Sequence, residues 1–462
     1  MTATRIERDS LGEVAVPTDA LFGAQTQRAL ENFPISGLCL PAPFLRALGR
    51  VKQVAARVNG ELGELDPKRA AAIAEAAREI ALGRHMDQFP LDVFQTGSGT
   101  STNMNANEVI ATLASRALGE PVHPNDHVNR CQSSNDCIPT ALHLSLALAL
   151  RDHLLPTLAH LRETIEARAR ELDGVVKTGR THLVDAVPIR MGQELGAWAH
   201  HVRLAEERLA AVWPRLLEIA QGATAIGTGV NAHPEFRARF AALLAEETGL
   251  AFRPSRDPFA SLAVPDAAVE LHAALRGLAA ALLKLTNDVR WMASGPKAGL
   301  AEIALPALQP GSSVMPGKVN PVAAEALAMV CFQVLGHDVA VGVAAGSGNF
   351  QLHLAWPLLA WNLHQSLAGL ANGARVLADR ALAGFTVDAA RLAAQAERNP
   401  ILATALAPAI GYERAAAIAR RAYAEDRPVR AVAAEESGLD AATLTRLLDP
   451  HRLTDPHDPR LS

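Results

Sequence analysis

The segment from Gly311 to Pro321, GSSVMPGKVNP, combines side chains that could perform acid–base chemistry with a chain that can bend. It holds two serines, a lysine and an asparagine among helix-breaking glycines and prolines. Such a loop could place a basic serine beside a lysine that binds an anion. Pro321 suits the first turn of a following helix, where a missing N–H costs nothing. On the pattern alone, a plain linker between two helices is an equally good interpretation.

Four further blocks are rich in Ser, Thr, Asn, Asp and His: TGSGTSTNMNANEV at 96–109, HPNDHVNRCQSSND at 123–136, GRTHLVDAVP at 179–188 and NDVRWMASGP at 287–296. The glycines of the first block allow the backbone to approach a carboxylate closely, and its hydroxyls can donate. It is no phosphate loop, because GK[ST] is missing. Taken one at a time, short turns and structural histidines explain these blocks as well as catalysis does.

The elements that must position these blocks are mostly long helices. Stretches rich in Ala and Leu cover 140–174, about 188–221, 266–294, 319–345 and 354–383, and Gly174 suits a helix C-cap. A helix of 30 residues is ~45 Å long. Five rods of similar length predict one elongated bundle.

The 36 residues from 339 to 374 contain no Asp, Glu, Lys or Arg. A helix with a face in water needs polar cover there. Its polar side chains are only Ser, Asn, Gln and His, among them Ser347, Asn349, Gln351, His353, Asn362, His364, Gln365 and Ser366. The segment is too polar to span a lipid bilayer, and it has too few charged side chains for a helix face in water. We expect burial inside an assembly of several subunits; the alternative is a central helix of a large monomer.

Composition bounds the remaining possibilities. The chain has 462 residues, which suggests about three domains. With 49% hydrophobic and 20% charged residues it is globular, and its formal net charge of −4, without a basic run, argues against nucleic-acid binding. The four cysteines show no CxxC pair, the N-terminus has no signal-type apolar run, and polar residues interrupt every long apolar stretch. We therefore expect a cytoplasmic protein without a membrane span.

In this order, the five blocks resemble those of the fumarase/aspartase superfamily, and GSSVMPGKVNP resembles its signature loop. The match to class II fumarases is close. The resemblance implies a mainly all-α fold of three domains: an N-terminal lyase domain at 1–133, a central five-helix bundle at 134–388 and a small helical domain at 389–462. It also implies a homotetramer with a twenty-helix core, in which three subunits share each active site.

The activity implied by this resemblance is the reversible hydration of fumarate to L-malate, a step of the tricarboxylic acid cycle. Removing a proton next to a carboxylate creates an enediolate-like species, whose extra charge needs preorganised donors in a dry site. A base and an acid must act on the two sides of the substrate. We expect no metal or organic cofactor, because no Cys or His cluster has ligand spacing.

By motif position, the resemblance makes Ser312 the catalytic base, His182 the proton donor/acceptor and Glu325 the carboxylate that pairs with this histidine. It assigns contacts with the dicarboxylate substrate to a larger set: Ser98, Gly99, Thr100, Ser133, Ser134, Asn135, Thr181, Ser313, Lys318, Val319 and Asn320.

A secondary anion site near the entrance, the B site, is implied at His123, Pro124, Asn125 and Asp126. Asn and Asp before a short helix are also ordinary N-caps, and the two readings carry equal weight. Glu120 stands where some family members carry a basic residue, which leaves the anion affinity of this entrance open.

Two alternatives remain. Aspartate ammonia-lyase belongs to the same superfamily, but His182 and Ser134 are typical of fumarases, whereas TSTNMNANEV at 100–109 looks somewhat more like an aspartase. A scaffold protein that has lost catalysis, as some lens crystallins have, should show decay at the catalytic positions. Ser312, His182, Lys318 and Glu325 are all present.

Overall fold

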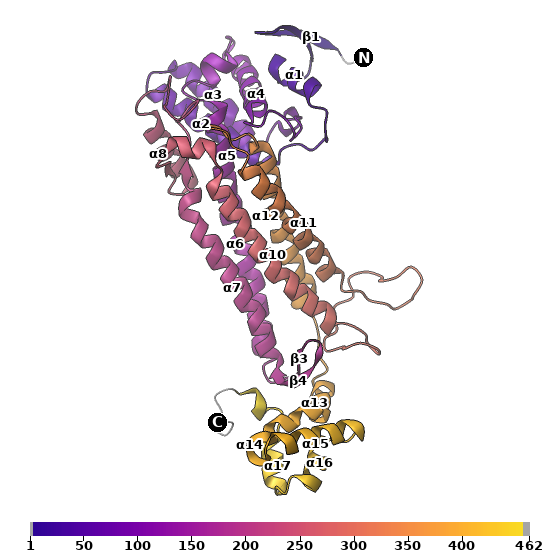
Figure 1. The fold of residues 1–462 in the computed structure, drawn as a ribbon. Coiled ribbons are helices and arrows are strands. Elements are labelled where there is room, and N and C mark those ends of the chain that lie inside the picture. Colours follow the sequence, from indigo (N-terminus) through magenta and orange to yellow (C-terminus); the bar gives the residue numbers. More distant parts are fainter. Residues whose placement is uncertain (1–2, 456–462) are drawn as a thin grey trace. The chain divides into compact units, whose positions relative to one another are not determined.

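The computed structural model describes residues 3–455, and helices dominate it (Figure 1). The chain divides into two compact units. Unit 1 comprises Met1–Pro156, Ala205–Ala279 and Val330–Ala371; unit 2 comprises Thr157–Leu204, Ala280–Met329 and Asn372–Ser462. The mainly helical class predicted from the sequence is confirmed. The three predicted domains stay a prediction, and their outer ends, 1–2 and 456–462, lie outside the described residues.

The five predicted long helices are present. One runs through α5 (Ser134–Ala149), a π-helical turn η3 (Leu150–Leu154) and α6 (Leu155–Glu171). The others are α7 (Met191–Leu216), α10 (Asp266–Met292), α11 (Val322–Ala345) and α12 (Trp356–Leu377), which η4 (Ala378–Leu382) extends. In the π turn, the N–H of Leu155 reaches the carbonyl of Leu150, one residue farther back than in an α-helix.

Unit 1 is built around helix α2 (Ala42–Glu61), which packs against α3 (Pro67–Ala81) and α5. One face of α2 is fully buried, including Leu48, Val51 and Val54. Helix α4 (Thr100–Leu118) lies against α3 and α1 (Ala24–Asn32). The smaller elements of this unit are β1 (Thr4–Asp9), β2 (Gly12–Pro17), η1 (Met86–Gln88), η2 (Pro124–Val128), β5 (Glu218–Ile219), α8 (Phe236–Thr248), β6 (Arg253–Pro254) and α9 (Pro258–Ala263).

Unit 2 contains an antiparallel hairpin that the sequence analysis missed, β3 (Val176–Thr181) and β4 (Val184–Arg190). For this reason α7 begins at Met191 and not near residue 188. The hairpin packs on a group of short helices with its own core around Leu406, Ile418 and Val432. These helices are α13 (Ala389–Arg398), η5 (Pro400–Leu406), α14 (Ala407–Ile410), α15 (Tyr412–Ala424), α16 (Val429–Glu436), α17 (Ala441–Leu447) and η6 (Arg452–Thr454).

Among the described residues, α11 is long and apolar enough to cross a membrane by length and composition, with a mean hydropathy of 1.7 over its most apolar window. One such helix is weak evidence for a span. The helix also carries Asp338, which accepts hydrogen bonds from His272 and Arg276 in unit 1. Asp338, a charged residue that interrupts this apolar stretch, is thus engaged in contacts within the protein.

Candidate active site

The first motif block forms a tight turn at the N-terminus of α4. Gly99 caps the helix with a φ of 77°, a left-handed conformation that favours glycine. A Cβ at this position would also approach Ile138 to 2.9 Å. The turn places the Ser98 hydroxyl 2.8 Å from the Thr100 hydroxyl. Both the backbone conformation and the space beside Ile138 therefore favour glycine at this cap.

The second block begins α5 with a capping box. Ser133 caps the helix, and its own backbone N–H donates to the carboxylate of Asp136. The other oxygen of Asp136 accepts the N–H groups of Gly222 and Thr224, at 3.0 and 2.8 Å. Burial raises the pKa of Asp136, while these backbone donors counteract the shift. The box holds Ser133, Ser134 and Asn135 in a fixed turn.

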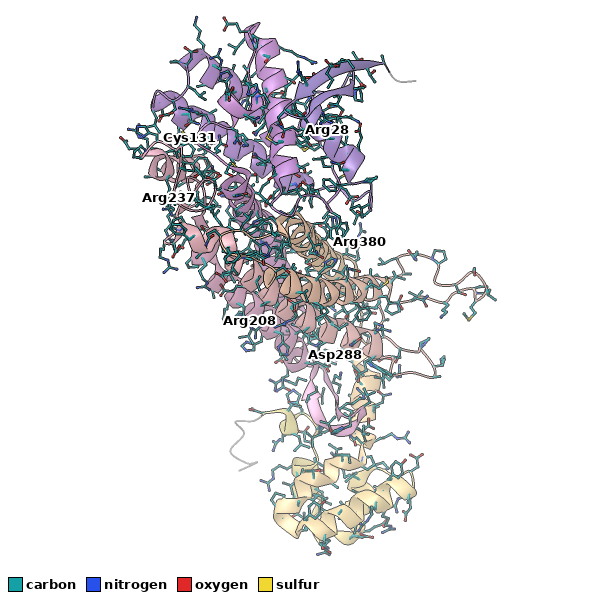
Figure 2. All side chains as sticks on the ribbon, turned by 45° about the horizontal axis from the view of Figure 1, so that its top comes forward. Arg28, Cys131, Arg208, Arg237, Asp288 and Arg380 are labelled. Atoms are coloured by element: carbon teal, nitrogen blue, oxygen red, sulfur yellow. The ribbon has the colours of Figure 1, made fainter. Side chains whose placement is uncertain are left out.

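These two turns meet in unit 1. The Thr100 hydroxyl lies 2.8 Å from the Ser134 hydroxyl, so a continuous chain of hydroxyls connects Ser98 to Ser134. Thr100 and Ser134 line a cavity of about 390 Å³, whereas Ser98 is buried behind its wall. Its wall also includes Ser133 and Cys131, the latter labelled in Figure 2. The structure therefore brings together two blocks that the sequence could only place in order.

The predicted B site borders the same cavity. Asn125 and Asp126 line it, whereas His123 and Pro124 do not. The ring of His123 caps the π-helical turn η2, because its Nδ1 accepts the N–H of Asp126 at 3.1 Å. The cap of this turn is therefore His123 and not the Asn or Asp considered from the sequence, and the B site stays a prediction. Glu120 is exposed and lies 4.0 Å from Arg69.

His182 occupies the turn of the β3–β4 hairpin in unit 2. The two-residue turn, His182 and Leu183, has positive φ at both positions, 56° and 62°. This is the pattern of a type I′ turn, whose twist matches that of the flanking strands. The imidazole is exposed, next to Thr181 at the end of β3. The hairpin therefore presents both residues outward at its tip.

A buried ionic network fixes the base of this hairpin. The ammonium of Lys177, 1% exposed, donates to Glu194 and to Glu302. The second oxygen of Glu302, equally buried, accepts from Arg180 at 2.6 Å. Below the hairpin, the side chain of Asn399 donates to the carbonyl of Ala186 at 2.8 Å. Charged contacts of β3 and a polar contact of β4 thus anchor the strands that flank His182.

The signature block forms a loop closed on itself between α10 and α11 (Figure 1). The N–H of Gly311 donates to the carbonyl of Lys318, and the amide of Asn320 donates to the carbonyl of Gly311 at 2.6 Å. A Cβ at Gly311 would lie 2.2 Å from that Lys318 oxygen. Glycine at 311 is therefore a steric requirement of the loop.

Ser312 has an environment suited to a base. Its hydroxyl oxygen accepts two backbone N–H groups, from Val314 at 3.1 Å and Met315 at 2.9 Å. Donors to an oxygen stabilise its deprotonated form, which a serine needs in order to take a proton from carbon. In one chain this loop is largely exposed, and Val314 is 82% exposed. A dry site there requires further protein to cover it.

A second cavity, of about 1220 Å³, lies beside the loop in unit 2. Lys318, Val319, Asn320 and Glu325 line it, together with part of the block at 287–296, including Asn287 and Arg290. Ser312 and Ser313 are not in its wall. Across the described residues of unit 2, no hydrogen bond or ion pair joins His182 to Glu325, so their predicted pairing stays a prediction.

Several polar residues at these cavities were not singled out from the sequence. Asn103 lines the smaller cavity, 2% exposed, and its Oδ1 has no hydrogen-bond partner among the described residues. Gln132 and Asn129 lie in the same wall, and Arg391 lies in the wall of the larger cavity. Asn103 stands inside the recognised block at 96–109, so its position was available as a signal. Arg391 has no local signal, because it reaches the cavity from α13.

No group of three or more His, Cys, Asp or Glu among residues 3–455 is placed to hold a metal ion. The four cysteines are free thiols. Burial raises the pKa of the Cys137 thiol to about 12, so this side chain is protonated near neutral pH.

Comparisons with known proteins agree with the motif blocks. A family model described as "Lyase" matches residues 12–336, and one described as "Fumarase C C-terminus" matches residues 402–455. Fumarate hydratase class II 2 of Pseudomonas aeruginosa is 57% identical over 454 residues, which cover 98% of this chain and 99% of that protein. Fumarate hydratase class II of Xylella fastidiosa is 56% identical and covers 98% of this chain and 95% of its own length.

The fold is equally similar. The crystal structure of recombinant class II fumarase from Schistosoma mansoni matches with a TM-score of 0.96 at 36% identity, covering 99% of this chain and all of that one. The likeness in sequence and in structure extends over nearly the whole chain and includes every motif block. The chain belongs to the class II fumarate hydratase family.

Proposed function

We propose that the chain hydrates fumarate through a site assembled from three polar clusters. The first comprises the hydroxyl chain of Ser98, Thr100 and Ser134. The second is the hairpin tip with Thr181 and His182, and the third is the signature loop. The reversible conversion of fumarate to L-malate follows from the family. The observation that best supports the roles within it is the pair of backbone donors to the Ser312 hydroxyl.

The roles follow from the charges that the reaction creates. In the dehydration direction, Ser312 takes a proton from the carbon next to a carboxylate. The electron pair spreads into that carboxylate, and Lys318 and Asn320 hold the resulting negative charge. The hydroxyl on the neighbouring carbon then leaves as water after it receives a proton, which His182 supplies directly or through a water molecule. Hydration reverses these steps.

The remaining predicted residues serve binding. The hydroxyls of Thr100, Ser133, Ser134 and Thr181, with the amide of Asn135, are donors for the second carboxylate. Gly99, which has no side chain, lets the backbone approach this second carboxylate closely. Ser313 and Val319 contribute from the loop. Asn125 and Asp126 border the smaller cavity, which supports a weak anion site at its mouth, although Asp126 itself carries negative charge.

We infer that the active enzyme is a homotetramer whose sites combine segments of three subunits. Helix α11 carries a stripe of exposed apolar side chains: Met329 (63% exposed), Phe332 (57%), Val339 (67%) and Val343 (72%). These positions follow the 3–4 spacing of a helix–helix contact face. An apolar stripe of this kind needs a partner surface. The predicted cytoplasmic location is part of the same proposal.

The activity itself is tested with purified protein and either fumarate or L-malate, with and without ammonium. We expect L-malate to form from fumarate in the absence of ammonium, at a rate unchanged by exhaustive chelation. Turnover that depends on ammonium would instead favour the aspartate ammonia-lyase alternative, which the named relatives do not support. A complete loss on chelation that added metal reverses would disprove cofactor-free catalysis.

A further inference from the structure

A lysine is buried directly beneath the serine-rich turn of unit 1. Lys52 lies on α2 with 0% of its side chain exposed. Its Nζ lies 3.0 Å from Asn129 Oδ1, 3.1 Å from Gln132 Oε1 and 3.6 Å from the Cys137 sulfur. None of these partners is a carboxylate. A fully buried lysine without a direct acidic partner is costly, which calls for an explanation.

The contacts of Lys52 place it one side chain behind the cavity wall. Asn129 and Gln132 both line the cavity that Thr100, Ser133 and Ser134 share. The orientation of both amides is set by other bonds: the Asn129 amide nitrogen donates to the Gln132 carbonyl, and the Gln132 amide nitrogen donates to the carbonyls of Val128 and Arg130. Their oxygens therefore face Lys52, which fixes the turn that leads into Ser133.

A buried carboxyl group in the first turn of α5 gives a reason for a cation nearby. Asp136 is 0% exposed and belongs to the capping box of Ser133. Asp136 directly follows Asn135 in the sequence. The charged form of its side chain would repel a dicarboxylate bound at this turn. Burial lowers the pKa of Lys52 and raises the pKa of Asp136, and the charge of each group opposes the shift of the other.

We propose that Lys52 is a positioning and charge-balancing residue of the dicarboxylate site, which holds the 129–132 turn and offsets the buried charge of Asp136. This inference rests on the proposed binding role of the Thr100, Ser133 and Ser134 cluster. It predicts that the lysine matters more for a dianion than for a monoanion of the same shape, because a structural contact would serve both equally.

The test compares succinate with its monoamide, succinamate, as non-reacting ligands. Their affinities are measured by inhibition of fumarate hydration at fixed pH and ionic strength. Two variants remove the charge. Lys52→Met retains a long, unbranched side chain, and Lys52→Gln introduces an amide that can donate to Asn129 or Gln132. If Lys52→Met fails to fold, the glutamine variant still carries the test. The control is Lys68→Met, which makes the same change in net charge at an exposed position on α3.

We expect both Lys52 variants to bind succinate about tenfold more weakly, with a change of at most about threefold for succinamate. The Lys68 variant should match the parent for both ligands. An equal loss for the two ligands would make Lys52 a plain core residue and overturn the proposal, as would no loss at all. If the parent chain itself neither hydrates fumarate nor binds succinate, the proposed function fails rather than this inference.

Discussion

Ser312 is the residue on which the proposed chemistry depends most directly. Replacing it with alanine removes the oxygen that Val314 and Met315 hold and leaves Lys318 and Asn320 in place. We expect Ser312→Ala to lower kcat by ~10²–10⁴-fold, the usual contribution of a positioned base, while succinate still binds. Steady-state kinetics and succinate inhibition measure the two effects.

The control for this substitution is Ser10→Ala, which removes an exposed hydroxyl in the turn between β1 and β2 and should leave kcat unchanged. Near-parent turnover of Ser312→Ala would show that the base is another group. A parallel loss of succinate binding would show that the loop captures the anion, with the base still to be found.

His364 is a buried residue that should make stability depend on pH. Its Nε2 lies 2.8 Å from the Ser145 hydroxyl, and burial lowers its pKa to about 4. Between pH 6.5, the ordinary pKa of histidine, and about pH 4, His364 is protonated in the unfolded chain but neutral in the folded chain. The stability due to the neutral ring is therefore complete above pH 6.5 and is lost as the pH falls toward about 4.

We expect the free energy of unfolding to fall between pH 7 and pH 5, with His364 contributing about 2 kcal/mol of the loss. His364→Gln, which keeps a hydrogen-bonding group beside Ser145, should lose less over this range. Urea unfolding at constant protein concentration measures the difference, and the exposed His201→Gln serves as the reference. Identical pH dependence of parent and His364→Gln would contradict this assignment.

At this scale the sequence could single out residues where a motif existed, and their roles stay predictions. Ser98, Thr100 and Ser134 were assigned from two separate blocks, and their hydroxyls are in contact. Lys52 could not be found in this way. It stands alone in an ordinary helical stretch, and its partners Asn129 and Gln132 lie 77 and 80 positions further along the chain.

At the scale of elements, the long helices followed from their Ala- and Leu-rich composition, but the β3–β4 hairpin did not. Its turn, His182 and Leu183, contains neither Asn nor Gly, the residues that usually mark a two-residue hairpin. The positive φ values there instead match the twist of the two flanking strands. Buried ion pairs between distant segments, such as Lys177 with Glu302, leave no local pattern in a sequence.

The anchoring network of this hairpin gives the element-scale prediction. Glu302→Gln leaves one positive charge of Lys177 and Arg180 uncompensated in the protein interior. We expect this change to lower the free energy of unfolding by ~3–5 kcal/mol. If the network also positions the tip, kcat should fall more than KM rises, because His182 acts in the chemical step. Unfolding and steady-state kinetics measure both quantities.

The matched control is Glu270→Gln, which breaks an exposed pair with Arg215 on the long helices of unit 1. Its effect on stability should stay within about 1 kcal/mol, since exposed pairs contribute little. A Glu302→Gln enzyme with parent stability and parent kcat would show that the network neither supports the fold nor positions the turn.

At the scale of the whole molecule, the exposed stripe on α11 predicts the assembly. Light scattering should give about four times 48.9 kDa for the parent. Val339→Glu places a charge in the stripe and should yield smaller species with little activity. Leu11→Glu, at a position 79% exposed in the β1–β2 turn, should leave mass and activity unchanged. A parent that is monomeric and active would contradict the burial argument drawn from residues 339–374.

From the proposed sharing of each site by three subunits, we infer that the hairpin tip and the signature loop of one site come from different chains, which is the central claim of this account. It is tested most directly by mixing two inactive variants, His182→Asn and Ser312→Ala, by co-expression or joint refolding. In randomly mixed tetramers, about a quarter of the sites would combine an intact His182 with an intact Ser312 from different chains. We therefore expect activity to return to about a quarter of the parent value, although each variant alone is nearly inactive. No recovery in mixtures shown to contain hybrid tetramers would contradict the shared site.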